Sequence, residues 1–166
     1  MYRTLHLFVA SMLVFSLASC GGGGGNSNSG STPASSCSAG SSANTGSASV
    51  TALSHVDTVV GTGPKAAAGN VLTVNYQGWL FNSAAVNNQG TLFASSLGTP
   101  ISFILGLGQV IPGWDQGLVG MQAGGTRTLT IPSSLGYGSC PPVGSPIPPN
   151  SALVFTVNLV SITTSP

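Results

Sequence analysis

Val110-Ile111-Pro112-Gly113-Trp114-Asp115-Gln116 is the most informative segment of this 166-residue chain. Pro112 suits the first position of a helix, because the N–H that it lacks would be unbonded there. The large apolar residues that follow recur at spacings of four and three, on one helical face: Trp114, Leu118 and Met121. Gly124-Gly125 ends this pattern. The sequence therefore predicts one short helix over 112–122 that packs its apolar face on a sheet, with an indole at its start.

Segments with the period-two alternation or the β-branched and aromatic content of strands surround this helix. They run over residues 52–60, 71–79, 91–95, 101–105, 126–132 and 152–162. The Asn-rich stretch 81–90 is predicted to be a long hairpin or bulge. We therefore expect an α+β domain of roughly 110 residues, with an antiparallel sheet of about five strands curled over one short helix.

The N-terminal residues have the pattern of an export signal. Arg3 supplies a positive charge, and the apolar stretch 7–17 is too short to span a bilayer as a mature helix. Leu17-Ala18-Ser19-Cys20 follows and resembles a bacterial lipobox, in which the cysteine sulfur receives a lipid. Residues 1–19 are thus predicted to be a lipoprotein signal peptide and Cys20 a lipid anchor. The alternative is an ordinary cleavage site that happens to contain a cysteine.

The segment over residues 20–50 is predicted to be a flexible linker. It consists mainly of Gly, Ser, Asn, Ala and Thr, so it buries too little apolar surface to offset its ordering entropy. A Gly/Ser coil of about 30 residues reaches on the order of 30 Å. Gly21 stands where Asp would indicate retention at the inner membrane, which favours the outer membrane, with the domain in the periplasm or at the cell surface. We expect a monomeric domain over residues 51–164 on this tether.

Charged side chains are scarce in this chain. Asp, Glu, Lys and Arg make up 3% of it, where about 25% is ordinary. Without the signal peptide, Lys65 and Arg127 balance Asp57 and Asp115. We expect no nucleic-acid partner, because phosphate binding needs clustered basic residues. So few carboxylates also predict that stability changes little as the pH falls.

Two of the three cysteines remain once Cys20 is assigned to lipid. Cys37 lies in the linker and Cys140 in a late loop, an even number for an oxidising compartment. They form a candidate disulfide that would hold the tether beside the domain. Two unpaired or intermolecular thiols are the alternative, because the geometry of a bridge cannot be read from sequence.

Five separated motifs occur in the order of one enzyme family. They are VNYQGW at 74–79, LFASS at 92–96, VIPGWDQ at 110–116, LGYG at 135–138 and IPPN at 147–150. Between residues 69 and 162 the chain therefore resembles the FKBP-type peptidyl-prolyl cis/trans isomerases. The resemblance implies an FKBP-like fold, which agrees with the sheet and helix predicted above. It also implies an enzyme that isomerises Xaa-Pro bonds and assists the folding of exported proteins, with no cofactor.

Prolyl isomerisation breaks no covalent bond, and its barrier of about 18–20 kcal/mol is the amide resonance lost as the C–N bond twists. A site that removes water from the amide and binds the twisted form better than the planar forms is sufficient. The resemblance implies such an aromatic cup from Tyr76, Phe93, Val110, Ile111, Trp114, Tyr137, Ile147 and Phe155. Trp114 would lie under the proline ring. The Ile111 N–H and the Tyr137 hydroxyl would donate to the carbonyls on either side of the bond.

The chain departs from the family pattern at three positions. Phe93-Ala94-Ser95-Ser96 stands where Phe-Asp-Ser-Ser is common, so the carboxylate that usually hydrogen-bonds near Tyr76 is missing. Ile101 stands where an aromatic is usual, and Pro146 where a branched aliphatic is usual. We therefore expect weaker activity on short Xaa-Pro peptides and reduced affinity for macrolide inhibitors.

Other functions stay open at this stage. The same cup could hold proline-containing or apolar segments, as a lipid-tethered binding module or chaperone with little catalysis, and the missing acid favours this alternative. A third interpretation is a structural lipoprotein that uses the fold as a scaffold. Metal and hydrolytic chemistry are disfavoured, because His55 has no second ligand at metal spacing and Ser95 and Ser96 lack the partners of a triad. Asp115, in the first helical turn, is expected to favour the helix dipole.

Overall fold

Two long antiparallel strands, β2 (Asn70–Phe81) and β6 (Leu153–Thr164), form the centre of the fold. The computed structural model describes residues 46–96 and 98–164, which contain six strands in one antiparallel sheet. The other strands are β1 (Ser54–Val59), β3 (Gln89–Ser95), β4 (Ile101–Ile104) and β5 (Thr126–Ile131). Their order is β1-β5-β6-β2-β3, with β4 paired to β2 off this path. The predicted fold class is confirmed, with six strands in place of about five.

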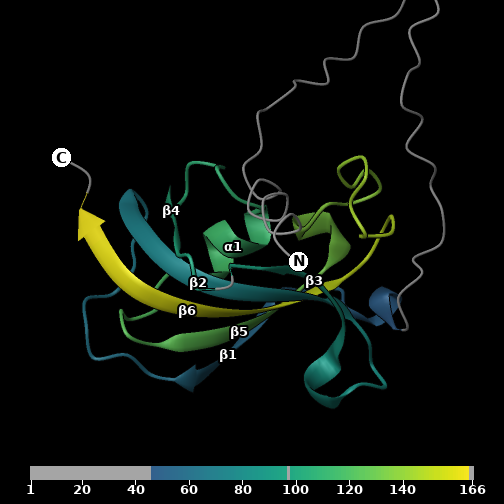
Figure 1. Ribbon diagram of the computed structural model, residues 1–166, viewed down its shortest axis with the longest axis horizontal. Coiled ribbons are helices and arrows are strands. Elements are labelled where there is room, and N and C mark those ends of the chain that lie inside the picture. The colour runs from purple at the N-terminus through teal and green to yellow at the C-terminus, as the bar shows by residue number, and fades with distance from the viewer. Residues whose placement is uncertain (1–45, 97, 165–166) are drawn as a thin grey trace, which may run out of the picture.

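The central strands separate a core face from an outer face. Their buried residues alternate with more polar and more exposed ones, as a half-buried strand requires. The buried set on this face is Leu72, Val74, Tyr76, Phe155, Val157 and Leu159. Figure 1 shows β2 and β6 curving beneath the helix, so these side chains form the wall on which the helix packs.

The helix α1 (Pro112–Gly117) is shorter than the predicted 112–122. Gly120 has a φ of 76°, and its N–H donates to the Ala66 carbonyl at 2.8 Å, so the chain leaves the helical path. Met121 is nevertheless buried in the core from the turn that follows. The predicted end was therefore wrong, because the apolar spacing continues after the helix has stopped.

The connection between β2 and β3 is both a hairpin and a bulged ladder, as predicted for 81–90. It contains the short 3₁₀ helix η3 (Val86–Asn88), in which Asn87 and Asn88 have φ values of 54° and 58°. Asparagine is among the few non-glycine residues that tolerate this left-handed conformation. The register between the two strands shifts on either side of Trp79.

The ordered domain begins before residue 51, inside the predicted linker. The 3₁₀ helix η2 (Ser47–Ser49) lies against the sheet, where the buried Ser47 hydroxyl accepts a hydrogen bond from the Ala152 N–H at 3.1 Å. Val50 packs on a small apolar cluster at the ends of β2 and β6. These contacts compensate the ordering entropy that the Gly/Ser composition alone does not offset.

A buried arginine forms hydrogen bonds both to the edge strand β1 and to the end of α1. Arg127 on β5 is 4% exposed. Its guanidinium donates to both carboxylate oxygens of Asp57 on β1, at 2.6 and 3.0 Å. It also donates to the carbonyls of Gly117 and Val119, at 2.8 and 3.1 Å, where α1 ends. The hydrogen bonds from Arg127 hold the pKa of Asp57 below its ordinary value.

Across residues 46–96 and 98–164, none of the helices has the length and apolarity that a membrane span requires.

Protonation of Asp57 is expected to limit stability in acid, in contrast to the small pH dependence that the scarcity of carboxylates predicted. Because its folded-state pKa is lowered, the unfolded chain takes up the proton first, so the stabilisation is full above about pH 4 and is lost as the pH falls through the folded value. Asp57→Asn should cost about 1–3 kcal/mol at pH 7, because the buried guanidinium loses its counter-ion. Denaturant unfolding between pH 7 and pH 2.5 should show a flatter acid limb for the variant. Parallel acid limbs in the two proteins would contradict this assignment.

Candidate active site

The centre of the candidate site is a cluster of aromatic rings between α1 and the sheet. Trp114 lies in the first turn of α1 and is fully buried. Its ring meets those of Tyr76 on β2 and Phe155 on β6 edge to face, each with ring centroids 5.3 Å apart. Tyr76 and Phe155 also contact each other, at 6.4 Å. Such edge-on pairs stabilise beyond the area that they bury, so the three rings form a rigid unit.

Two further rings extend this cluster. Phe93 on β3 is half-buried and packs edge-on against Phe155 at 5.5 Å. Phe103 on β4 packs against Trp114 at 5.7 Å and is buried. Phe103 was not among the residues predicted for the site, although it lies in a predicted strand. The short pairing of β4 with β2 brings it there.

All eight residues predicted for the cup lie in one apolar cluster. Seven of them are buried and Phe93 is half-buried: Tyr76, Phe93, Val110, Ile111, Trp114, Tyr137, Ile147 and Phe155. The last turn before Tyr137 is the 3₁₀ helix η4 (Ser133–Leu135). The structure thus brings together every residue that the motifs nominated, and their roles in binding stay predictions.

Polar atoms inside the ring cluster are few. Within the described residues, the Tyr76 hydroxyl and the Trp114 Nε1 are buried and have no hydrogen-bond partner. Burial raises the pKa of Tyr76. Burial also raises the pKa of Tyr137, and the neighbouring Tyr76 raises it further. Both phenols therefore stay protonated through neutral pH and keep their hydrogen-bond donors.

Asp115 positions the loop that leads into α1. Its two carboxylate oxygens accept hydrogen bonds from the Gly106 and Gly108 N–H groups, at 2.8 and 2.9 Å. Gln109 accepts one from the Ile104 N–H at 2.8 Å. The sequence predicted only a helix-dipole role for this aspartate. It also fixes the segment that carries Val110 and Ile111 over the rings.

Ser96 fixes the backbone of Tyr76. Its hydroxyl accepts a hydrogen bond from the Tyr76 N–H at 3.1 Å, and its own N–H donates to the Tyr76 carbonyl at 3.0 Å. The same hydroxyl donates to Asn75 Oδ1 at 3.2 Å. Ser96 thus bridges β2 at the point between its pairing with β3 and its pairing with β4. No such role was predicted for this serine, because the bridge depends on a register that composition does not show.

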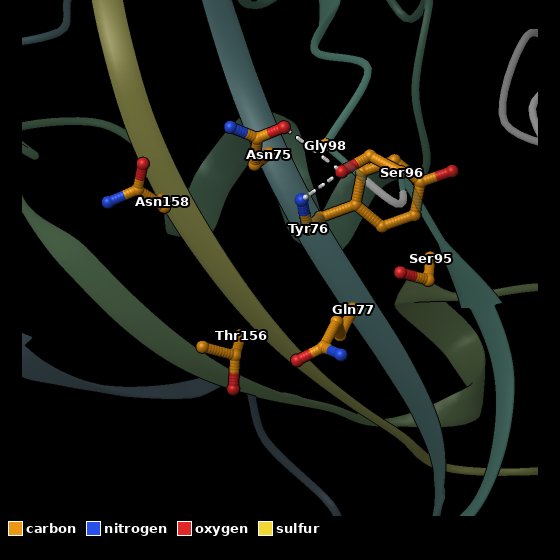
Figure 2. A pocket seen from close by; sticks show the side chains of 8 residues that line it. All are labelled: Asn75, Tyr76, Gln77, Ser95, Ser96, Gly98, Thr156 and Asn158. Atoms are coloured by element: carbon orange, nitrogen blue, oxygen red, sulfur yellow. Dashed lines mark hydrogen bonds between the residues drawn. The ribbon is translucent and has the colours of Figure 1, made fainter.

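A shallow groove of ≈ 370 Å³ lies along β2 and β6 on the outer face of the sheet. Figure 2 shows the side chains that line it, which are Asn75, Tyr76, Gln77, Ser95, Ser96, Gly98, Thr156 and Asn158. Asn75 and Gln77 alternate with Tyr76 along the strand, so they point away from the ring cluster. Asn158 is already engaged, since its amide donates to the Gly125 carbonyl and to the Thr126 hydroxyl. We assign the groove to the hydrated outer face.

Side chains that bind metal ions are not grouped in the described part of the chain. His55 lies on the exposed edge strand β1, and no three His, Cys, Asp or Glu side chains gather there in a way that could hold a metal ion. Cys140 is disulfide-bonded. Cys20 and Cys37 lie outside the described residues, so the predicted pairing of Cys37 with Cys140 stays a prediction.

Comparison with known proteins identifies the class that this fold and ring cluster define. Residues 63–160 match the family model of the FKBP-type peptidyl-prolyl cis-trans isomerases, and the chain belongs to that family. A FK506-binding protein of Neisseria meningitidis serogroup B is 47% identical over 104 residues, which cover 61% of this chain and 88% of that protein. FK506-binding protein 2 of Kluyveromyces lactis is 51% identical over 100 residues, which cover 59% and 66%.

Solved structures agree with this assignment. FkpA from Escherichia coli is 37% identical with a TM-score of 0.58, and the match covers 70% of this chain and 50% of that one. A peptidyl-prolyl cis-trans isomerase from Pseudomonas syringae is 32% identical with a TM-score of 0.55, and covers 68% and 76%. The chain is accordingly a peptidyl-prolyl cis-trans isomerase of FKBP type, as its motifs predicted.

Gly78 is a further site residue, because it leaves room for two of the rings. A Cβ at this position would lie 2.6 Å from Phe155 and 3.0 Å from Phe93. Gly78→Ala should therefore displace both rings, cost about 1–3 kcal/mol of stability, and lower kcat/KM for Xaa-Pro peptides. Denaturant unfolding and a cis/trans exchange assay measure the two effects.

Gly124→Ala is the matched control for that change. Gly124 has a φ of 83° and open space around its Cβ position, so alanine there should cost about 1–2 kcal/mol through backbone strain alone. This variant should lose stability and keep its kcat/KM. Equal losses of activity in both variants would show that reduced stability, and not ring displacement, is responsible.

Proposed function

We propose that isomerisation takes place on the ring cluster, with the proline ring of the client seated on Trp114. The observation that carries this proposal is the edge-on packing of Tyr76 and Phe155 against the indole, which gives a rigid apolar surface next to the start of α1. Moving an Xaa-Pro amide from water onto such a surface removes the solvation that favours its planar, charge-separated form. The twisted form loses less by this transfer, so the barrier falls.

Hydrogen-bond donors complete the proposed site. The Ile111 N–H and the Tyr137 hydroxyl would donate hydrogen bonds to the carbonyl oxygens on either side of the rotating Xaa-Pro bond. Tyr137 suits this role because its raised pKa keeps its proton in place through neutral pH. A donor that is already oriented in a dry environment contributes more than the same donor in water. No nucleophile is needed, because no covalent bond is formed or broken.

Substitutions in the proposed site should lower catalysis, and Trp114→Leu should also lower stability, because the indole attaches α1 to the sheet. Tyr137→Phe removes one donor and should lower kcat/KM about 3- to 10-fold. Trp114→Leu removes the indole surface and should lower it by roughly tenfold or more. A protease-free cis/trans exchange assay on short Xaa-Pro peptides measures both, with circular dichroism to confirm that the variants are folded.

Val56→Thr is the matched control for this assay. Val56 is 65% exposed on the edge strand β1, and threonine has nearly the same shape, so kcat/KM should not change. If Tyr137→Phe and Trp114→Leu also leave kcat/KM unchanged, the activity resides elsewhere. An absence of catalysis with tight binding of proline-containing clients would instead support the binding-module alternative, which Ala94 favours.

The cellular setting is part of the same proposal. The signal-like residues 1–19, the lipobox-like cysteine and the linker over 20–50 favour an exported isomerase that is anchored by lipid, with the outer membrane preferred. Its clients would be exported proteins whose folding rate is limited by the cis/trans isomerisation of Xaa-Pro bonds. A monomer on a tether is the simplest arrangement. Macrolides of the FK506 type would bind with reduced affinity, because Ala94 replaces the usual acid.

The exported protein should contain no free thiol. Cys20 should carry lipid, and Cys37 and Cys140 should form the disulfide, so a maleimide should label the mature chain only after reduction, and then at two cysteines. Cys20→Ser should move the protein from the detergent phase to the aqueous phase on partitioning. Labelling without reductant would contradict the disulfide, and an unchanged partition would contradict the lipid anchor.

A further inference from the structure

We infer that the Tyr76 hydroxyl is a substrate-binding hydrogen-bond donor in this chain, and that Ala94 is the residue that leaves it available. The inference deepens the proposed function and rests on it. The hydroxyl would bind a carbonyl oxygen of the client segment that lies on the ring cluster. In this way residue 94 determines which chemical groups of a ligand the site can satisfy.

The first observation is that this hydroxyl is buried and unpaired. Tyr76 is 3% exposed, and no group of residues 46–96 or 98–164 forms a hydrogen bond with its Oη. Buried polar atoms nearly always have a partner, because an unmade hydrogen bond costs more than a made one gains. An exception inside a ligand-binding cluster is therefore explained most simply by a partner that arrives with the ligand.

The second observation is the identity of the surrounding side chains. Tyr76 lies between the rings of Trp114 and Phe155. Ala94, at the position where the family pattern has an acid, is 6% exposed, belongs to the same apolar cluster, and pairs with Gly78, two residues after Tyr76 on β2. Its methyl group accepts no hydrogen bond, so residue 94 offers the phenol no acceptor.

The third observation is that Tyr76 cannot easily turn away. Its backbone N–H and carbonyl are both bonded to Ser96, at 3.1 and 3.0 Å. Its ring is held edge-on by Trp114 with an interplanar angle of 80°. The hydroxyl is therefore a preorganised donor, which loses little freedom when a ligand binds.

The chemistry of the substrate explains why a donor is needed. Proline has no backbone N–H, so the groups nearest the rotating bond of an Xaa-Pro segment are carbonyl acceptors. These carbonyls lose their water when the segment enters an apolar site. Burial raises the pKa of Tyr76, so the phenol keeps its proton for them. A carboxylate at position 94 would instead accept the hydrogen bond of the Tyr76 hydroxyl, which would then not be available to the substrate.

Tyr76→Phe tests the inference because it removes only the oxygen. It should lower kcat/KM for a tetrapeptide with a central Ala-Pro bond by about 3- to 10-fold. It should leave the unfolding midpoint of the free protein unchanged or raised, because an unpaired buried hydroxyl is removed. A merely structural tyrosine would show the reverse, with lower stability and an activity that follows only the folded fraction.

Ser151→Ala is the matched control. Ser151 is 2% exposed, and in the described part of the chain its hydroxyl is also buried without a partner. Removing it should leave stability unchanged or raised in the same way, with kcat/KM unaltered. If Tyr76→Phe changes kcat/KM by less than twofold while the unsubstituted chain is active, the inference is wrong and the proposed function stands. An inactive unsubstituted chain would overturn both.

Ala94→Asp supplies the opposite test. The new carboxylate should accept a hydrogen bond from the Tyr76 hydroxyl and so lower peptide kcat/KM, which is the reverse of the sequence-based expectation that the missing acid weakens activity. In this background Tyr76→Phe should destabilise the protein and have little further effect on activity. The coupling between the two changes is the measured quantity. If Ala94→Asp raises peptide kcat/KM, the weak point of the site is the missing acid, and the direct role of the hydroxyl is overturned. If Ala94→Asp does not fold, the comparison of Tyr76→Phe with Ser151→Ala decides alone.

Discussion

The packing of the Trp114 indole against Tyr76 and Phe155 attaches the helix to the sheet at the centre of the core. A helix of six residues has no stability of its own, so α1 exists only because its buried side chain is fixed to the sheet. Two glycines allow the close approach, since a Cβ on Gly113 or Gly117 would lie 2.5 or 2.8 Å from side chains of β5. In the proposed function, the contact that attaches the helix is also the place where a proline would bind, so stability and function would share one set of rings.

Hydrogen bonds between uncharged side chains connect neighbouring strands of this domain. On the outer face, hydroxyls and amides of neighbouring strands bond to each other, as with Asn158 and Thr126 at 3.1 Å. The buried Arg127 is compensated by Asp57 and by two carbonyls at the end of α1. The hydrogen bonds between uncharged side chains on the outer face are insensitive to salt, whereas the ion pair of Arg127 and Asp57 is shielded from salt only as far as it is buried.

Period-two alternation predicted the central strands well, because one face of each is buried and the other is not. The order of the motifs nominated eight residues that the structure brings together. The end of α1 could not be predicted, because the spacing of apolar residues does not depend on the positive φ of Gly120, where the chain leaves the helix. Phe103 and Ser96 were missed for another reason. Both residues reach the ring cluster through contacts with β2, and contacts between distant segments cannot be inferred from local composition.

The bond between Asp57 and Arg127 joins residues that are 70 positions apart in the chain. β1 is synthesised early because it lies near the start of the domain. Among the described strands it pairs with β5 alone, so it cannot join the sheet before β5 has been synthesised. Contacts of such long sequence separation slow folding, because a large loop must close before they form. The edge strand β1 is therefore expected to join the sheet late in folding, after β5 has been synthesised.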